Sequence, residues 1–131
     1  MKIGIIGTGM VGATLGTKLV QLGHQVTMGS RNSGNEKAVK WVSENVTAGN
    51  FKNAGQGNFA DAASFGDIVF NCTKGDGAMD AVKAAGESNL NGKILVDVSN
   101  PLDFSKGMPP SLFPELSNTN SLGEEIQKTF P

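Results

Sequence analysis

Apolar residues near the start of the chain change their spacing twice. Residues 2–6 (KIGII) form a short apolar run of the kind that fills a buried parallel strand. Residues 13–22 then place apolar side chains at helical spacing, and Gly23 ends that stretch. A second extended run begins at residues 25–28 (QVTM). The pattern therefore predicts a strand, a helix and a strand in succession.

The alternation continues along the chain. Helices are predicted at residues 36–44, 59–65 and 78–85, and strands at residues 67–72 and 93–98. Strands that alternate with helices imply right-handed crossovers and a parallel sheet. The fold class expected from this order is α/β, with a doubly wound parallel sheet in one domain over residues 1–131.

The segment between the helices predicted at residues 36–44 and 59–65 is less regular. Residues 46–51 (VTAGNF) predict a short third strand, because they contain β-branched and aromatic side chains. Residues 52–58 are rich in glycine, asparagine and glutamine and predict a loop. Within the helix predicted just before them, Ala38, Trp41 and Val42 are expected to point inward.

A glycine-rich turn separates the first predicted strand from the first predicted helix. Its residues are Gly7, Thr8, Gly9, Met10, Val11 and Gly12. In this spacing the first glycine allows a tight turn, the second lets the backbone approach a pyrophosphate, and the third lets the helix pack closely on the sheet. An anion would bind backbone N–H groups at the positive end of the helix dipole. The strand and helix on either side favour a Rossmann NAD(P)-binding site over an ordinary turn.

The end of the second predicted strand indicates which dinucleotide binds. NAD-binding folds usually place a carboxylate there, about 20 residues beyond the glycines, to bind the ribose hydroxyls. This chain has Ser30, Arg31 and Asn32 instead, with no carboxylate before Glu36. An arginine can bind phosphate oxygens in a fork and stack on adenine, while serine and asparagine can donate hydrogen bonds. These residues at the end of the second strand therefore favour NADP over NAD. The alternative is that Arg31 is a solvated loop residue that binds no cofactor.

Two later strand ends are expected to face the same crevice, because ligands of such sheets bind at the carboxyl ends of the strands. Thr73 and Asn100 can hydrogen-bond the nicotinamide-side ribose or carboxamide, and Pro101 with Leu102 can wall the ring. Lys74 either contacts the pyrophosphate or is a solvated lysine, and Cys72 is interpreted as a small buried apolar residue. The candidate cofactor-binding residues at these ends are Asn71, Cys72, Thr73, Lys74, Ser99, Asn100 and Pro101.

Composition narrows the function classes. The 131 residues carry a formal net charge of −1, which favours neither a nucleic-acid partner nor a membrane surface. Cys72 is the only cysteine and His24 the only histidine, so disulfides, cysteine-rich metal sites and nucleophile–histidine catalysis are not expected. His24 falls in the turn before the second strand, far from the crevice. We expect a cytoplasmic protein with no metal and no acid–base catalytic residue.

The chain resembles, over essentially its whole length, the NADP oxidoreductase family that depends on coenzyme F420, a deazaflavin. The segments that carry the resemblance are KIGIIGTGMVGATLG, GHQVTMGSR, IVFNCTKG, ILVDVSNPLDFSKGMPP and SLGEEIQKTFP. Close relatives include the NADP-binding domains of membrane metalloreductases. The resemblance implies hydride transfer between the C4 atom of NADPH and a deazaflavin or flavin-like acceptor. It also implies that residues 7–12 hold the pyrophosphate, residues 30–32 the 2′-phosphate, and the segments at Asn71 and Asn100 the nicotinamide half.

The resemblance also implies that members of this family have a further region after the part that matches this sequence. Family members continue into a sixth strand and a small helical domain, which helps to build the acceptor pocket and often a dimer. This chain ends at Pro131, soon after residues 121–124 (SLGE) predict the start of a helix. It is therefore either a chain that lacks the family's C-terminal region or a minimal cofactor-binding module. Residues 103–120 predict an irregular loop, so we expect this chain to bind NADPH but to reduce such acceptors poorly.

Three functions of different classes remain open. The first is an NADP-dependent oxidoreductase, of which this chain is all or the cofactor-binding part. The second is a non-catalytic NADP-binding or sensing module, and the third is the N-terminal half of a 3-hydroxyacid or imine reductase. Hydride transfer between two cofactors needs positioning more than acid–base groups, so the missing catalytic residue does not count against the first.

Overall fold

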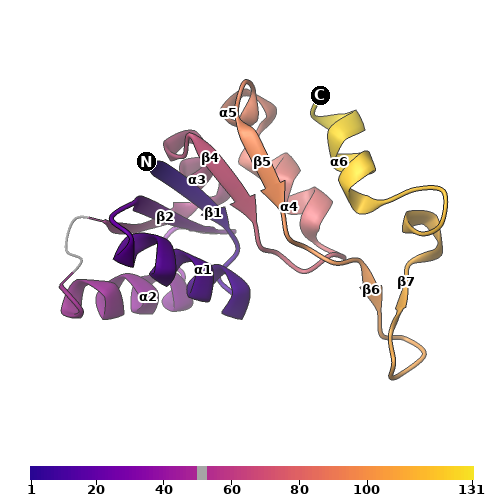
Figure 1. Ribbon diagram of the computed structural model, residues 1–131, viewed down its shortest axis with the longest axis horizontal. Helices are drawn as coiled ribbons and strands as arrows, with labels where there is room; N and C mark the ends of the chain where they lie inside the picture. The colour runs from indigo at the N-terminus through magenta and orange to yellow at the C-terminus, as the bar shows by residue number, and fades with distance from the viewer. Residues whose placement is uncertain (50–52) are drawn as a thin grey trace.

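The structure is a computed structural model that describes residues 1–49 and 53–131. Its centre is a five-stranded sheet with the order β3-β2-β1-β4-β5, and all four neighbouring pairs are parallel (Figure 1). The chain moves outward from β1 in one direction and then returns to build the other half, which is doubly wound topology. The predicted α/β fold is confirmed. The strands are β1 (Lys2–Ile6), β2 (Gln25–Ser30), β3 (Ala54–Asn58), β4 (Ile68–Asn71) and β5 (Ile94–Asp97).

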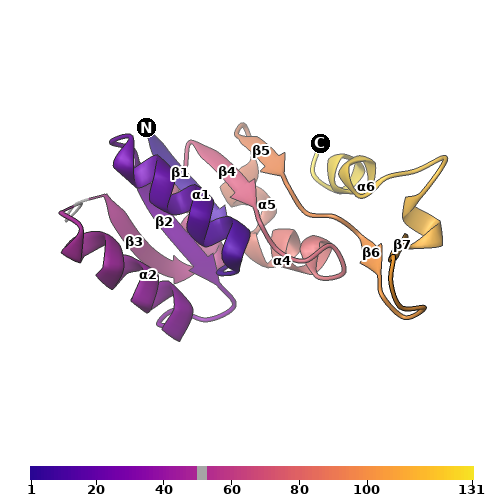
Figure 2. The ribbon, with the colours of Figure 1, turned by 60° about the horizontal axis from the view of Figure 1, so that its bottom comes forward.

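Helices cover both faces of the sheet (Figure 2). Successive side chains of a strand point to opposite faces, and in β1 the side chains of Ile3 and Ile5 join one apolar cluster while Ile6 joins the other. The first cluster lies under α1 (Met10–Gln21) and α2 (Glu36–Thr47). The second lies under α3 (Phe59–Phe65), α4 (Ala78–Ala85), α5 (Glu87–Leu90) and α6 (Leu122–Thr129).

The third strand is where the prediction is wrong. Residues 46 and 47 belong to α2, residues 48 and 49 form a turn, and β3 occupies residues 54–58, where a loop was expected. The rest of the predicted strand and the start of the predicted loop, at residues 50–52, lie outside the described residues. The sequence AGQGN has little strand propensity, but its backbone pairs with β2 along its whole length, from Ala54 beside Val26 to Asn58 beside Ser30. Tertiary pairing therefore overrides local propensity.

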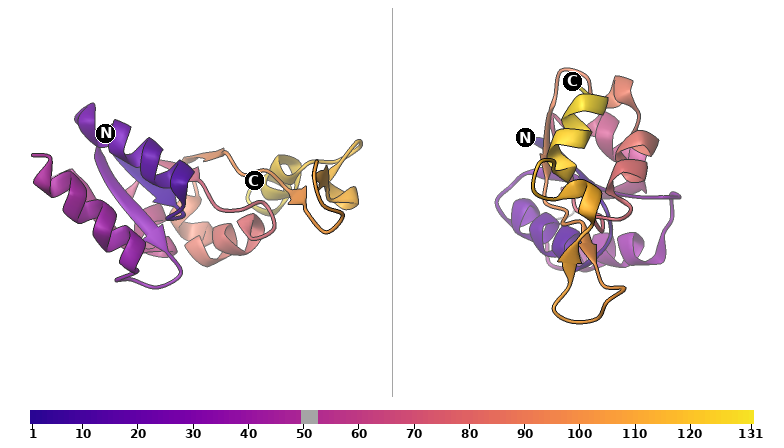
Figure 3. Two further views of the ribbon diagram at one scale, coloured as in Figure 1. Left: turned by 90° about the horizontal axis from the view of Figure 1, so that it is seen from below. Right: turned by 90° about the vertical axis from the view of Figure 1, so that its right-hand side faces the viewer.

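Residues 103–120 are also more regular than predicted. They include part of an antiparallel hairpin, β6 (Leu102–Asp103) with β7 (Ser111–Leu112), and a 3₁₀ turn at Pro114–Leu116. The pairing extends one residue beyond the two strands, because the Phe113 N–H donates to the Pro101 carbonyl oxygen at 3.1 Å. Figure 3 shows the hairpin and α6 together at one end of the molecule.

The C-terminal helix begins as the sequence predicts. The Ser121 hydroxyl accepts a hydrogen bond from the Glu124 N–H, and Leu122 and Ile126 are buried. Within residues 1–49 and 53–131, every helix is too short or too polar to cross a bilayer.

Candidate functional site

At its first and last positions, Gly7 and Gly12, the glycine turn has the geometry that the spacing predicts. Gly7 has φ +118°, a conformation that favours glycine, and its N–H donates to the Gly29 carbonyl oxygen at 2.9 Å. Gly12 is buried, and a Cβ atom there would lie 2.6 Å from the Gly7 carbonyl oxygen and 3.3 Å from Ile5 Cγ2. The absence of a side chain at Gly12 therefore lets the start of α1 pack closely on the turn and on β1.

Gly9 has a different environment. It is the N-cap of α1, makes no side-chain capping bond, and has an ordinary φ of −75°. A Cβ atom at Gly9 would meet nothing within 4 Å. The first turn of α1 also contains no acidic residue, so no side chain there neutralises the positive end of the helix dipole. The free N–H groups of this turn are open to an anion from outside.

A groove of about 970 Å³ runs from this turn across the carboxyl ends of β1, β2 and β4. Nine of the predicted residues line it: Gly7, Thr8, Gly9, Ser30, Arg31, Asn32, Cys72, Thr73 and Lys74. The other predicted residues do not line it: Met10, Val11, Gly12, Asn71, Ser99, Asn100 and Pro101. The fold thus brings the glycine turn, the loop after β2 and the loop after β4 to one hollow, as the strand-end argument requires.

The loop after β2 presents cations to the groove. Arg31 is exposed, whereas Ser30 is buried and its hydroxyl donates to the Asn32 carbonyl oxygen at 2.6 Å. The Ser30 hydroxyl proton is therefore used inside the loop and shapes it. Asn35 caps α2 by accepting from the Lys37 and Ala38 N–H groups, and this start of α2 places Lys37 on the groove. Lys37 was not among the predicted site residues, although Asn35 is a typical N-cap residue and indicates a helix that starts there.

Several other groove residues were not predicted. Asp76 lies in the turn just before α4 and Asp80 in the first turn of α4, and both are exposed. No sequence signal distinguished them from solvated carboxylates. The groove consequently carries charges of both signs: Arg31, Glu36 and Lys37 follow β2, and Lys74, Asp76 and Asp80 follow β4. The remaining unpredicted residues along it are Ser33, Gly34, Asn35, Glu36, Phe59, Gly77 and Ala81.

The loop after β5 lies behind the loop after β4. Gly75 packs directly against the Asn100–Pro101 peptide, in space that any Cβ atom would occupy. The Asn100 carbonyl oxygen also accepts from the Leu102 N–H at 2.8 Å. Asn100 and Pro101 therefore contact the loop after β4 at Gly75, and neither of them lines the groove.

Cys72 forms part of the groove wall and is largely buried. Burial, and secondarily the negative charge of Asp97, raise the pKa of the Cys72 thiol to about 11. The neutral thiol therefore persists across the physiological range, in agreement with its interpretation as a small apolar residue.

This pKa predicts a slow thiol. Since the thiolate is the reactive form, a rise in pKa from 9.0 to about 11 lowers its population at pH 8 about 100-fold. We expect Cys72 in the folded protein to react with a disulfide reagent about 100-fold more slowly than the same chain in denaturant. Reaction at equal rates in the two states would contradict this assignment.

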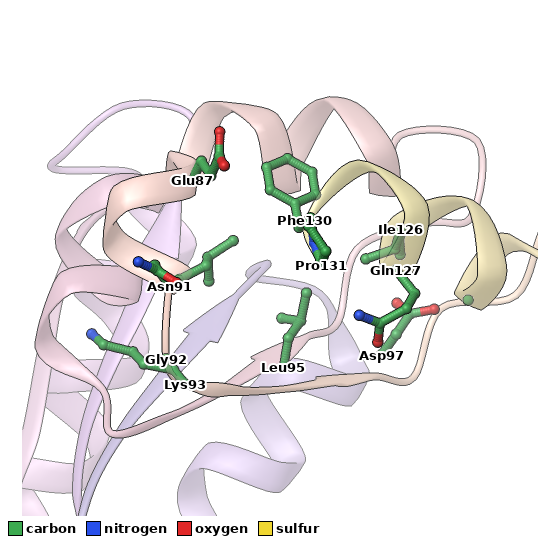
Figure 4. A pocket seen from close by; sticks show the side chains of 12 residues that line it. Glu87, Asn91, Gly92, Lys93, Leu95, Asp97, Ile126, Gln127, Phe130 and Pro131 are labelled. Carbon is green, nitrogen blue, oxygen red and sulfur yellow. The ribbon is translucent and has the colours of Figure 1, made fainter.

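A second hollow, of about 240 Å³, lies between β5, α5 and α6 (Figure 4). Its apolar lining includes Leu90, Leu95, Ile126 and Phe130, and Asp97 lies at the α6 side. None of the predicted cofactor-binding residues lines it. His24 lines neither hollow and is half-buried near the N-terminus, with its Nδ1 atom 3.4 Å from the Met1 amino group. Among residues 1–49 and 53–131, no three His, Cys, Asp or Glu side chains are placed to hold a metal ion.

Comparison with known proteins gives a consistent picture. Residues 2–101 match the family described as NADP oxidoreductase, coenzyme F420-dependent. A crystal structure from Arthrobacter sp. FB24, described as that of a candidate F420-dependent NADP reductase, is 46% identical with a TM-score of 0.86. The alignment covers 100% of this chain and 58% of the Arthrobacter chain.

Two more distant matches extend the comparison. Metalloreductase STEAP3 of Rattus norvegicus is 35% identical over 99% of this chain, which spans 22% of the rat protein. An imine reductase from Streptomyces aurantiacus is 20% identical with a TM-score of 0.58, covering 77% of this chain and 33% of the reductase, and shares the fold alone. This chain therefore spans little more than half of the Arthrobacter protein and about a fifth of the rat one.

Proposed function

The chain belongs to the coenzyme F420-dependent NADP oxidoreductase family, and from this premise we propose that its groove binds NADPH for hydride transfer to a deazaflavin or flavin-like acceptor. The observation that carries the proposal is the joining of three parts in one hollow: an open helix N-terminus, a cation-bearing loop and the loop after β4. These are the parts that a pyrophosphate, a 2′-phosphate and a nicotinamide riboside require. When bound, NADPH supplies the hydride from its nicotinamide C4 atom.

The phosphates are assigned to the glycine turn and the loop after β2. The backbone N–H groups that follow Gly9 bind the pyrophosphate, where no side chain obstructs its approach. Arg31 and Lys37 hold the 2′-phosphate, and Glu36, the first residue of α2, is the one carboxylate that lines the groove among residues 30–37. Ser30 acts through loop shape, because its hydroxyl proton is bound to Asn32.

The nicotinamide half is assigned to the loop after β4. Thr73 and Lys74 line this end of the groove, and the fully buried Asn71 lies directly behind them. Their task is positioning, since a hydride passes only when donor and acceptor atoms are about 3–3.5 Å apart. The neutral Cys72 thiol adds an unreactive wall.

Binding and turnover can be tested separately. NADPH and NADH are titrated into the protein by calorimetry, and NADPH oxidation is then followed with coenzyme F420, FMN or FAD as acceptor. We expect NADPH to bind at least about tenfold more tightly than NADH, because hydrogen bonds to charged groups contribute about 1.5–3 kcal/mol. Because this chain alone is expected to reduce such acceptors poorly, oxidation is also measured with a version extended by the C-terminal region of longer family members. Binding of NADPH without oxidation by either version would favour the non-catalytic binding module instead.

A further inference from the structure

Four polar side chains form a hydrogen-bonded chain behind the groove. The Asn71 side chain is fully buried between the ends of β4 and β5. Its Nδ2 atom donates to Asp97 Oδ1 at 3.0 Å, and its Oδ1 atom accepts from the Thr73 hydroxyl at 2.7 Å. The Ser99 hydroxyl donates to the same Asp97 oxygen at 2.6 Å. The chain links Asp97, which lines the smaller hollow (Figure 4), to Thr73, which lines the groove.

The direction of every bond follows from Asp97. A carboxylate only accepts hydrogen bonds, so the Asn71 side chain must turn its NH₂ group toward Asp97. That orientation turns the Asn71 carbonyl oxygen toward Thr73, and the Thr73 hydroxyl must then use its single proton on Asn71. Thr73 lines the groove, and its hydroxyl oxygen is left with lone pairs alone for any further hydrogen bond.

We propose that Asp97 is a positioning residue that, through Asn71, makes the Thr73 hydroxyl a hydrogen-bond acceptor facing the groove. The inference rests on the proposed binding of NADPH there. Its partner is a donor on the nicotinamide half, of which there are two: the ribose hydroxyls and the carboxamide NH₂ group. A ligand with only an acceptor at this point would meet two sets of lone pairs and bind poorly.

The first test removes the hydroxyl or the constraint on it. T73V deletes the acceptor while keeping the shape of the side chain, and D97N allows the Asn71 amide to reverse. We expect either change to weaken NADPH binding about five- to tenfold, the effect of one neutral hydrogen bond. T73S should restore binding. T47V makes the same chemical change on the exposed end of α2 and should leave binding unchanged.

A fragment separates this proposal from the proposed function. Adenosine 2′,5′-bisphosphate carries the adenine and 2′-phosphate but no nicotinamide, so its affinity should be equal in wild type, T73V and D97N. A merely structural role would weaken the fragment and NADPH together. If the fragment and NADPH both fail to bind wild type, the proposed function fails. If both bind and neither T73V nor D97N weakens NADPH, the positioning role alone is overturned.

An analogue identifies the donor. The 3-acetylpyridine analogue of NADPH has a methyl group in place of the carboxamide NH₂. If the carboxamide is the donor, T73V weakens NADPH but leaves the analogue unchanged. If a ribose hydroxyl is the donor, T73V weakens both to the same extent. If T73V weakens neither NADPH nor the analogue, Thr73 does not accept a hydrogen bond from this half of the cofactor.

Discussion

Replacing Arg31 by alanine is expected to remove most of the preference for NADPH over NADH. Arg31 is exposed on the groove beside the end of β2, and its guanidinium can bind a 2′-phosphate with two parallel N–H donors. Such a contact contributes about 1.5–3 kcal/mol, or roughly ten- to a hundredfold in affinity. NADH lacks the 2′-phosphate, so its affinity should change little. Calorimetric titration of both cofactors into the variant measures the ratio directly.

A matched substitution tests whether the loss of the preference for NADPH is specific to the cations that line the groove. Lys40 is an exposed cation of α2 that pairs with Glu44 and does not line the groove, so K40A should keep the full preference. Lys37 does line it, and K37A should reduce the preference partially. Equal affinity of the unmodified protein for NADPH and NADH would refute the assignment of the 2′-phosphate to this loop.

The sequence predicted the buried parts of the fold best. β1 and β4 are fixed by apolar side chains that only a covered strand accommodates, and the helix of residues 78–85 has the predicted bounds. β3 was missed because it has the sequence AGQGN, whose stability comes from backbone pairing with β2 and not from its own side chains. Pairing of that kind involves residues far apart in sequence, which no local pattern records.

The candidate site was predicted by strand-end position, and the limits of that argument are visible in Ser30 and Asn71. Both were placed correctly at strand ends, but each uses its polar groups inside the protein. Which side chain faces the groove depends on hydrogen-bond partners such as Asp97, which the sequence does not identify. Lys37 joins the site because the Asn35 cap fixes where α2 begins. The position of a residue along a strand thus predicts that it lies near the groove. Its hydrogen-bond partners decide whether its side chain can contact a ligand there.

The glycine turn offers a sharper test, because two of its glycines should fail in opposite ways. G9V adds a branched side chain where the structure has open space, with no atom within 4 Å of the new Cβ. Folding should therefore be preserved, whereas the pyrophosphate loses its approach to the helix N-terminus. We expect NADPH and NADH to bind at least about tenfold more weakly, which is about 1.4 kcal/mol, with little change in melting temperature.

G12V is the counterpart. Its Cβ atom would lie 2.6 Å from the Gly7 carbonyl oxygen, a backbone atom that cannot move aside without displacing the turn. Overpacking of this kind costs about 1–3 kcal/mol, so the melting temperature should fall by several degrees. The two variants thus separate affinity from stability within one turn. If G9V binds NADPH as wild type does, the pyrophosphate does not lie on the glycine turn. If G12V melts at the same temperature as wild type, the close packing of α1 on β1 does not stabilise the fold.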